Sequence, residues 1–528
     1  MSDGHRRASL SSRLICATSG AAREFSLNTD IEKNLETVHS VLEEAERYEH
    51  ACRIIGYDQQ TICPSEALEA QGETAAFLSN RAFLLTKSKK FIAAAESLYE
   101  NRGSLGKRER VLAEGLHRDY LRKKNVSAAL DREFSRTFNK AFVDWLEAKG
   151  KSDFSLFAGS LEKVRRVNLK QIALMENAKA DPYDNLLELY ERGMTSKDLD
   201  KCFDACKECL VPMLRKIRQS KKKIRTDFLS RPVPESAERK MAEYLLKTIG
   251  FDFSRGAFAV SEHPFTDCLA KDDVRVTTHY YGNMFYSNMF SIIHEGGHAL
   301  FEQNQPKEDF LAHIAGFKTL GQHESVSRFY ENRIGRSKAF IHLIFKKSRE
   351  IFPAVFDGVT EKQFYEAMNA VTPSLVRTEA DEFTYTFHII IRYEIERMLV
   401  NEKIDVMDLP KIWDDKYEEY LGVRPSNDRE GVLQDVHWTS GFGYFPTYAL
   451  GNMYNAMYYN RMCGELDVDA LVLSGDFVQI NNWMKENVWK EANLLDAKSW
   501  IRKITGRKFT ADDFLYYIEK KYGELYGV

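Results

Sequence analysis

The sequence is poor in cysteine, has no long apolar run and carries almost no net charge. Its eight cysteines are spread over 528 residues without the even, clustered spacing of a disulfide-stapled secreted domain, so we expect reduced thiols in a cytoplasmic protein. No window holds about 18 uninterrupted apolar residues, which excludes a membrane-spanning helix and predicts no membrane partner. The formal net charge is -3 with basic residues scattered among acidic ones, which argues against a nucleic-acid-binding surface.

Strand-like alternation is also scarce. It is clear only at about residues 274–280, which predicts one edge of a small sheet. Apolar residues instead recur at helical spacing through much of the chain. The clearest helical stretches are residues 29–49, 67–99, 105–147, 154–179 and 196–225. The predicted fold class is therefore all-α, mainly helical with a small β element.

Low-complexity linkers and internal repeats are absent as well, so residues 27–528 are predicted to form a single domain. Residues 1–26 are rich in arginine and serine and lack the apolar segment of a secretory signal. A disordered N-terminal extension is the simpler interpretation of this segment. Its composition also suits a mitochondrial targeting peptide, which stays an alternative.

Residues 294–298 spell His-Glu-Gly-Gly-His, an H-E-x-x-H motif. Side chains four residues apart on a helix face the same way, so His294 and His298 can bind one Zn²⁺, with Glu295 beside the water that such an ion holds. The alternative is a surface helix with two hydrogen-bonded histidines. Gly296 and Gly297 argue against it, because each costs a helix about 1 kcal/mol relative to alanine. Their missing side chains would let another segment or a substrate approach the metal.

Two ligands do not complete a catalytic zinc site, which normally has three protein ligands and one open position. The third ligand is expected on the inward face of a neighbouring helix. Glu324, 26 residues after His298, is the leading candidate, and the adjacent His323 is the competitor. Adjacent helical positions point about 100° apart, so both cannot easily face one ion. We expect His323 to orient a ligand or a substrate group instead.

Together with further short blocks in a fixed order, these motifs resemble the carboxypeptidase Taq family of zinc metallocarboxypeptidases. The resemblance runs from about residue 56 to the C-terminus. The blocks are residues 263–265, 273–278, 294–298, 323–325, 376–381, 431–438 and 441–448. The resemblance implies a saddle-like helical protein with a deep central groove, a homodimer, and Glu324 as the third zinc ligand.

The function that follows is a zinc-dependent carboxypeptidase of broad specificity, acting on peptides with a free C-terminus. Cobalt is the second candidate metal. Glu295 is expected to act as the general base, accepting a proton from the attacking water and returning it to the leaving amine. His437 and Tyr448, with Tyr444 behind them, are the candidates for stabilising the oxyanion. Their aromatic surroundings are equally typical of core packing.

An exopeptidase must also recognise the free α-carboxylate, for which a buried arginine is well suited. Arg377 is the leading candidate, since it resembles the arginine of the family's I-R-x-x-A-D block. Arg275 and His263 are weaker alternatives. A structural ion pair between Arg377 and Glu379 or Asp381 is the competing interpretation.

Three other functions compete. Cys202, Cys206 and Cys209 have the C-x3-C-x2-C spacing of radical enzymes with an iron–sulfur cluster and S-adenosylmethionine, although one helix face amid apolar residues favours packing. A zinc oligopeptidase or dipeptidyl-peptidase of the same helical architecture would share the metal chemistry. A non-catalytic binding protein would lack the chemistry, but every expected catalytic residue is present.

Overall fold

The computed structural model describes residues 7–316 and 318–528, and the side chains of residues 28–316 and 318–528. The chain forms two compact units, residues 1–121 with 307–315 and residues 122–306 with 316–528. We call them the N-terminal unit and the main unit. Residues 1–6 of the expected N-terminal extension lie outside the described residues, and the side chains of residues 7–26 are not described either. The extension therefore stays a prediction.

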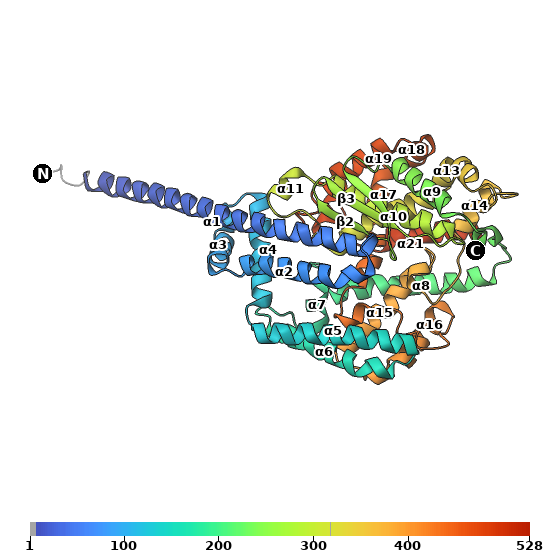
Figure 1. Ribbon diagram of the computed structural model, residues 1–528. Coiled ribbons are helices and arrows are strands. Elements are labelled where there is room, and N and C mark those ends of the chain that lie inside the picture. Colours follow the sequence, from blue (N-terminus) through green and yellow to red (C-terminus); the bar gives the residue numbers. More distant parts are fainter. Residues whose placement is uncertain (1–6, 317) are drawn as a thin grey trace. The chain divides into compact units, whose positions relative to one another are not determined.

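The N-terminal unit consists of helices (Figure 1). They are α1 (Arg7–Thr61), α2 (Leu68–Thr86), α3 (Lys89–Glu100), α4 (Lys107–Lys123, in its larger part) and α11 (Lys307–Leu311). Its small core includes Val38, Phe91, Leu98 and Leu112. α1 ends just before Cys63-Pro64. Proline cannot continue a helix without losing a backbone hydrogen bond.

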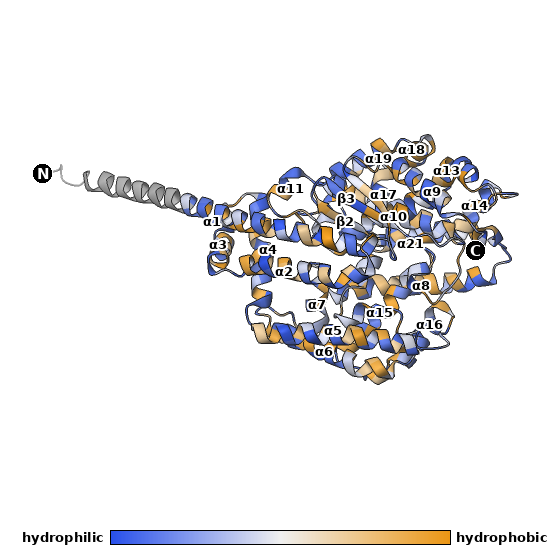
Figure 2. Ribbon diagram, in the orientation of Figure 1, coloured by the Kyte–Doolittle hydropathy of each residue, from blue (hydrophilic) through white to orange (hydrophobic). Residues whose placement is uncertain are grey.

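The main unit is also helical, which confirms the predicted fold class. Its helices are α5 (Ala128–Lys151), α6 (Ser155–Leu174), α7 (Pro182–Leu187), α8 (Ser196–Gln219), α9 (Glu235–Ile249), α10 (Phe285–Gln303), α12 (Leu320–Arg328), α13 (Lys338–Ile351), α14 (Glu361–Met368), α15 (Tyr385–Val400), α16 (Leu409–Leu421), α17 (Pro446–Cys463), α18 (Val468–Ser474), α19 (Phe477–Met484), α20 (Ala497–Thr505) and α21 (Asp512–Tyr526). Figure 2 shows hydrophobic and hydrophilic residues alternating along α5 and α6, as amphipathic helices require. No described helix combines the length and the apolar character that crossing a membrane demands.

A three-stranded sheet is the β element of the main unit. Its strands are β1 (Gly256–Val260), β2 (Thr266–Ala270) and β3 (Asp273–Thr278), in the order β1-β3-β2. β3 pairs with β1 in parallel and with β2 in antiparallel fashion. The expectation that the segment at 274–280 is a sheet edge was therefore wrong, because β3 is the central strand. Its two partner strands, β1 and β2, are short, and buried and exposed residues do not alternate clearly along them. The sequence pattern therefore did not reveal them.

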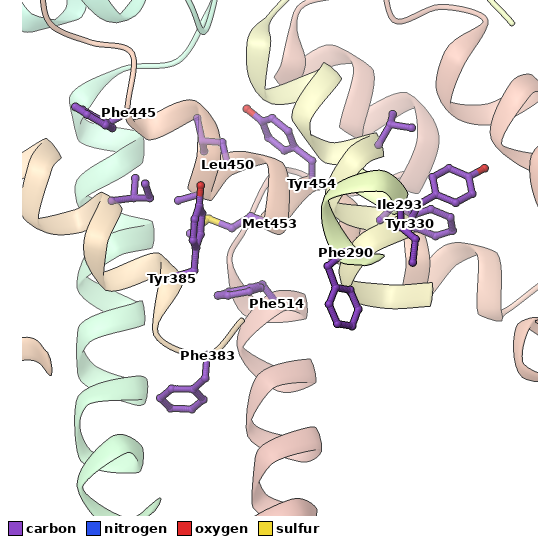
Figure 3. Close-up of a cluster of buried hydrophobic side chains, with 14 of the residues drawn as sticks. Phe290, Ile293, Tyr330, Phe383, Tyr385, Phe445, Leu450, Met453, Tyr454 and Phe514 are labelled. Atoms are coloured by element: carbon purple, nitrogen blue, oxygen red, sulfur yellow. The ribbon is translucent and has the colours of Figure 1, made fainter. Parts of the chain in front are cut away.

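The core of the main unit surrounds α17, which packs against α12 and α15, and α10 packs against α12 in turn. Figure 3 shows part of this core, where residues of α10 and α17 lie close to Tyr330, Tyr385 and Phe514. Leu450, Met453 and Tyr454 of α17 are fully buried. Because three helices are fixed against one another by this packing, side chains on them can be held at constant distances.

Candidate metal centre and active site

The H-E-x-x-H motif lies in the middle of α10, as predicted, and Glu324 lies on the neighbouring helix α12. Oε2 of Glu324 is 3.5 Å from Nε2 of His294 and 3.3 Å from Nε2 of His298. The three ligand atoms thus converge on one point. Among the described side chains, these residues form the one group of His, Cys, Asp or Glu that could hold a metal ion.

These separations suit a tetrahedral ion. Bonds of about 2.1 Å at tetrahedral angles place neighbouring ligand atoms about 3.4 Å apart. The two measured separations lie on either side of that value. Two imidazoles and one carboxylate are also a ligand set that hydrolytic metal sites use. The residues present therefore fit a single divalent ion with one position left open.

The two glycines of the motif allow neighbouring helices to pack against α10. A Cβ atom on Gly296 would lie 2.6 Å from Cδ1 of Ile249, at the end of α9. A Cβ atom on Gly297 would lie 2.8 Å from Cα of Ser327 on α12. Both distances are shorter than a normal contact, so a larger residue would push these helices apart. The alternative of an idle surface helix is excluded, because most of α10 is buried.

Glu324 is held as an anion by its surroundings. Nε of Arg328 donates to it at 2.8 Å and Oγ of Ser327 at 3.0 Å. Burial alone would raise the pKa of Glu324, but His294 and Arg328 hold that pKa well below its usual range. On the other side, α17 approaches through Gly451, where a Cβ atom would lie 2.8 Å from Cγ of Glu324. The carboxylate is thus both charged and fixed in place.

Glu331 orients His294, a role that was not predicted from the sequence. Nδ1 of His294 lies 2.9 Å from Oε2 of Glu331, which Arg328 also contacts at 3.0 Å. A carboxylate on the second ring nitrogen fixes the tautomer of a metal-binding histidine. Glu331 lies in η4 (Phe329–Gly335), a π-helical segment that follows α12 directly. Its only sequence signal is its position seven residues after Glu324.

His323 does not compete with Glu324 for the metal position. Its Nε2 lies 2.8 Å from Oε1 of Glu302, and its ring stacks on His298 with centroids 4.4 Å apart. Nδ1 of His298 is buried and has no hydrogen-bond partner within residues 28–316 and 318–528. Stacking on His323, rather than a hydrogen bond from it, therefore positions the His298 ring.

Glu295 is buried next to the convergent ligands. Oγ1 of Thr266, on β2, lies 2.8 Å from its Oε2 and also 2.8 Å from its backbone carbonyl oxygen. Burial raises the pKa of Glu295, while His294 lowers it. The small sheet thus has a clear role at this site: it supplies a hydroxyl that fixes the rotamer of the Glu295 carboxylate.

His437, Tyr444 and Tyr448, the candidates for stabilising the oxyanion, form one aromatic group. Ring centroids of His437 and Tyr444 are 5.2 Å apart, and those of Tyr444 and Tyr448 are 5.4 Å apart. Burial raises the pKa of both tyrosines, and Glu324 raises both further. Arg377 lowers the pKa of Tyr448, but less than burial raises it. Burial lowers the pKa of His437 to about 4, so its imidazole is neutral near pH 7.

Arg377 pairs with Asp435 rather than with Glu379 or Asp381. Its Nε lies 3.2 Å from Oδ1 of Asp435, whose Oδ2 is 2.6 Å from Nε of Arg392. Two guanidinium groups thus share one carboxylate, which leaves one positive charge in excess. The Arg377 guanidinium also lies over the Tyr448 ring, 4.8 Å from its centroid. The guanidinium of Arg377, whose charge is only partly neutralised by Asp435, therefore lies beside the aromatic group of His437, Tyr444 and Tyr448.

The other two predicted binding residues, Arg275 and His263, each contact a residue two positions away in the sequence. Arg275 makes a two-pronged ion pair with Asp273 of its own strand, with both distances 2.9 Å. His263 lies between β1 and β2, where its carbonyl oxygen accepts from Oγ of Ser261 at 2.6 Å. Substrate binding by either residue stays a prediction.

The cysteines on α8 have the properties of packing residues. Cys202 and Cys206 belong to the main core. Burial raises the pKa of Cys202 to about 11 and that of Cys209 to about 12, so both are thiols rather than thiolates near neutral pH. Among the described side chains, the three sulfur atoms do not form a group that could hold a metal ion. The structure therefore argues against the radical-enzyme alternative.

A buried carboxylate, Glu396 of α15, anchors the loop that carries His437 and Tyr444. It accepts hydrogen bonds from Nε1 of Trp438 at 3.0 Å and from the backbone N–H of Gly443 at 3.0 Å. The hydroxyl of Tyr183 donates to it at 2.9 Å. One side chain thus holds both ends of the loop.

We expect Glu396→Gln to remove part of the pH dependence of stability. Burial outweighs the donated hydrogen bonds and raises the pKa of Glu396 from 4.5 to about 7. The fold therefore favours the neutral acid, and the free energy of unfolding falls as the pH rises from 4.5 to about 7, by up to about 3 kcal/mol. Glutamine cannot titrate, so the Tm difference between wild type and variant should shrink over this pH range in scanning calorimetry. A difference that stays constant would show that Glu396 is ionised throughout.

Comparisons with known proteins give a consistent result. A family model described as the carboxypeptidase Taq (M32) metallopeptidase matches residues 37–522. Carboxypeptidase 1 of Bacillus subtilis (strain 168) is 37% identical over 488 residues, which cover 92% of this chain and 97% of that protein. Thermostable carboxypeptidase 1 of Pyrococcus furiosus is 36% identical over 501 residues, 92% of this chain and 98% of that protein.

Solved structures agree. The M32 carboxypeptidase from Deinococcus radiodurans R1 matches with a TM-score of 0.90 and 31% identity, covering 94% of this chain and all 100% of that one. A carboxypeptidase structure from Pyrococcus furiosus matches with a TM-score of 0.88 and 33% identity, covering 93% of this chain and 99% of that one. Sequence and fold thus match over nearly the full length of these relatives.

Proposed function

This chain belongs to the carboxypeptidase Taq (M32) family of metallopeptidases, and we propose that it uses one Zn²⁺ to remove single residues from the C-terminal ends of peptides. His294, His298 and Glu324 would hold the ion. The observation that carries the proposal is the convergence of these three ligand atoms next to the buried Glu295. The membership itself was predicted from the motif blocks and is confirmed.

Zinc is the proposed metal because it favours four-coordinate sites with nitrogen and oxygen ligands. Cobalt suits similar ligands and is the second candidate. A bound ion of either kind would lower the pKa of a water molecule and polarise the scissile carbonyl. All other steps fall to side chains of this chain.

Glu295 is the proposed general base. Its carboxylate accepts a proton from the attacking water and returns that proton to the leaving amine. Thr266 supports this assignment, since its hydroxyl donates to Oε2 of Glu295 and fixes that oxygen. The other oxygen of Glu295 is the one we assign to the water.

His437 and Tyr448 are the proposed donors to the oxyanion that forms when water attacks. Their rings lie 6.4 Å apart, and Tyr444 packs against both. A neutral imidazole and a phenol near pH 7 can each donate one hydrogen bond without carrying a charge. Such preorganised donors stabilise charge that develops only in the transition state.

Arg377 is the proposed binding residue for the substrate's α-carboxylate. The excess positive charge of the Arg377–Asp435–Arg392 group supports this assignment, because a carboxylate would neutralise it. His323, Arg275 and His263 are secondary candidates for contacts with the substrate. A free carboxylate is the feature that separates a chain end from an internal peptide bond, so Arg377 would make the enzyme an exopeptidase.

Replacing Arg377 with glutamine is expected to lower kcat/KM for a free-acid peptide about a hundredfold, mainly through KM, because a charged hydrogen bond is lost. Cleavage of the C-terminally amidated peptide should be slow in both proteins. Mass spectrometry of digested peptide pairs, with and without a chelator, measures this. Arg424→Gln is the matched control, since Arg424 is an exposed arginine paired with Asp415. Equal cleavage of acid and amide by the wild type would favour an oligopeptidase instead.

The family resemblance supports a homodimer that acts on peptides in the cytoplasm, with residues 27–528 as its catalytic domain. None of the described cysteines forms a disulfide, as expected in a reducing compartment. Light scattering on the purified protein tests the dimer directly. A monomer at micromolar concentration would contradict it.

A further inference from the structure

The hydroxyl of Tyr385 is buried and unpartnered. Tyr385 is 4% exposed, and its hydroxyl has no hydrogen-bond partner within the described part of the chain. Other buried tyrosines nearby behave differently. Tyr393 of the same helix donates to Asp200 at 2.7 Å, and the hydroxyl of Tyr417 lies 2.9 Å from Nδ1 of His388. A buried polar group without a partner costs about 1–3 kcal/mol, so its presence calls for an explanation.

Tyr385 packs against the group that supports the metal ligands. It is the first residue of α15, and its ring lies under the guanidinium of Arg328, 4.2 Å from ring centroid to Cζ. Arg328 in turn donates to Glu324 at 2.8 Å. Tyr385 is therefore separated from the proposed metal site by a single side chain.

The same residue also borders the proposed carboxylate site. The guanidinium of Arg377 lies over the ring of Phe445, with Cζ 5.6 Å from the ring centroid. Figure 3 shows Tyr385 in one cluster with Phe445, which precedes α17. Tyr385 thus lies between the residues that hold the metal and those assigned to the substrate's chain end.

The charges around Tyr385 select the kind of partner. The guanidinium of Arg328 lies over its ring, and the Arg377–Asp435–Arg392 group has one positive charge in excess. A hydroxyl there finds its most favourable acceptor in an anion, because hydrogen bonds to charged groups are about twice as strong as neutral ones.

We propose that Tyr385 is a substrate-binding residue, whose hydroxyl donates a hydrogen bond to the α-carboxylate of the C-terminal residue beside Arg377. This inference rests on the proposed carboxypeptidase function. It adds a neutral donor to the charged one, so that the carboxylate oxygens are bound by two different groups. Discrimination between an acid and an amide then depends on Tyr385 as well as on Arg377.

The test is Tyr385→Phe in the metal-loaded Glu295→Gln protein, with binding of a peptide and its C-terminal amide followed by calorimetry. We expect the free acid to bind about 10- to 50-fold more weakly and the amide to bind unchanged. The Tm should stay equal or rise, since the variant removes an unpartnered hydroxyl rather than a hydrogen bond. Tyr393→Phe is the matched control on the same helix: it should lower the Tm and leave the acid-to-amide affinity ratio unchanged.

The possible failures are distinguishable. If the parent protein prefers the acid but Tyr385→Phe keeps that preference in full, Tyr385 is not a carboxylate ligand, and the proposed function stands. Equal weakening of acid and amide, or a fall in Tm like that of Tyr393→Phe, would also overturn the inference and indicate a structural role. If the parent protein does not distinguish acid from amide, the carboxypeptidase proposal itself fails, and the role of Tyr385 fails with it.

Discussion

Glu295→Gln is expected to lower kcat about a thousandfold while the metal content stays at one ion per chain. General base catalysis contributes about 10²- to 10⁴-fold, and glutamine cannot accept the proton from water. The substitution preserves size, and Thr266 can still donate to the amide oxygen of glutamine. Steady-state kinetics on a free-acid peptide, with metal analysis of the same sample, measures both quantities.

The control for this variant is Glu243→Gln, the same change at a glutamate of α9 that pairs with Arg239 at the surface. It should leave both kcat and metal content at the wild-type values. Normal turnover by Glu295→Gln would refute the assigned proton acceptor. Loss of the metal together with activity would mean that Glu295 is needed to hold the ion instead.

Glu324→Ala is expected to weaken metal binding by more than about a hundredfold and to abolish activity. Changes to residues that merely support a ligand cost about 10- to 100-fold in metal affinity, and removal of a ligand should cost more. The variant also leaves Arg328 without the carboxylate that it contacts at 2.8 Å. Two imidazoles beside Arg328, whose remaining carboxylate partner is Glu331, are a poor site for a divalent ion.

Competition with a fluorescent chelator gives the metal affinity directly. Glu361→Ala is a matched control, since this glutamate of α14 pairs with His342 at the surface. It should bind metal like the wild type. If Glu324→Ala retained a tightly bound ion, another residue would have to be the third ligand.

The parts of the site that the sequence predicted well are those encoded within one helix or one short block. His294 and His298 face the same side because they are four residues apart, and the structure places their ring nitrogens accordingly. The prediction of Glu324 also required the assumption that a neighbouring helix packs against the motif helix. The structure places Glu324 on such a helix, next to the two histidines. Local periodicity determines which side of a helix a residue faces, so such predictions need no knowledge of the fold.

The parts that the sequence did not predict depend on contacts between distant segments. Arg377 and Asp435 are 58 residues apart, and the competing partners Glu379 and Asp381 looked more suitable because they are close in sequence. Glu331 lies within a π-helical segment, whose spacing differs from that of the α-helix assumed in reading the sequence. The central position of β3 likewise depends on partner strands with weak patterns of their own. Three-dimensional packing decided each of these cases.

The proposed mechanism requires one ion bound jointly by His294, His298 and Glu324. Anomalous diffraction at the zinc absorption edge, from crystals of the zinc-loaded protein, tests this directly. We predict one strong peak per chain, about 2.0–2.2 Å from Nε2 of both histidines and from a carboxylate oxygen of Glu324. A zinc-loaded crystal with no peak among these side chains, or with its only peak elsewhere, would contradict the proposed mechanism.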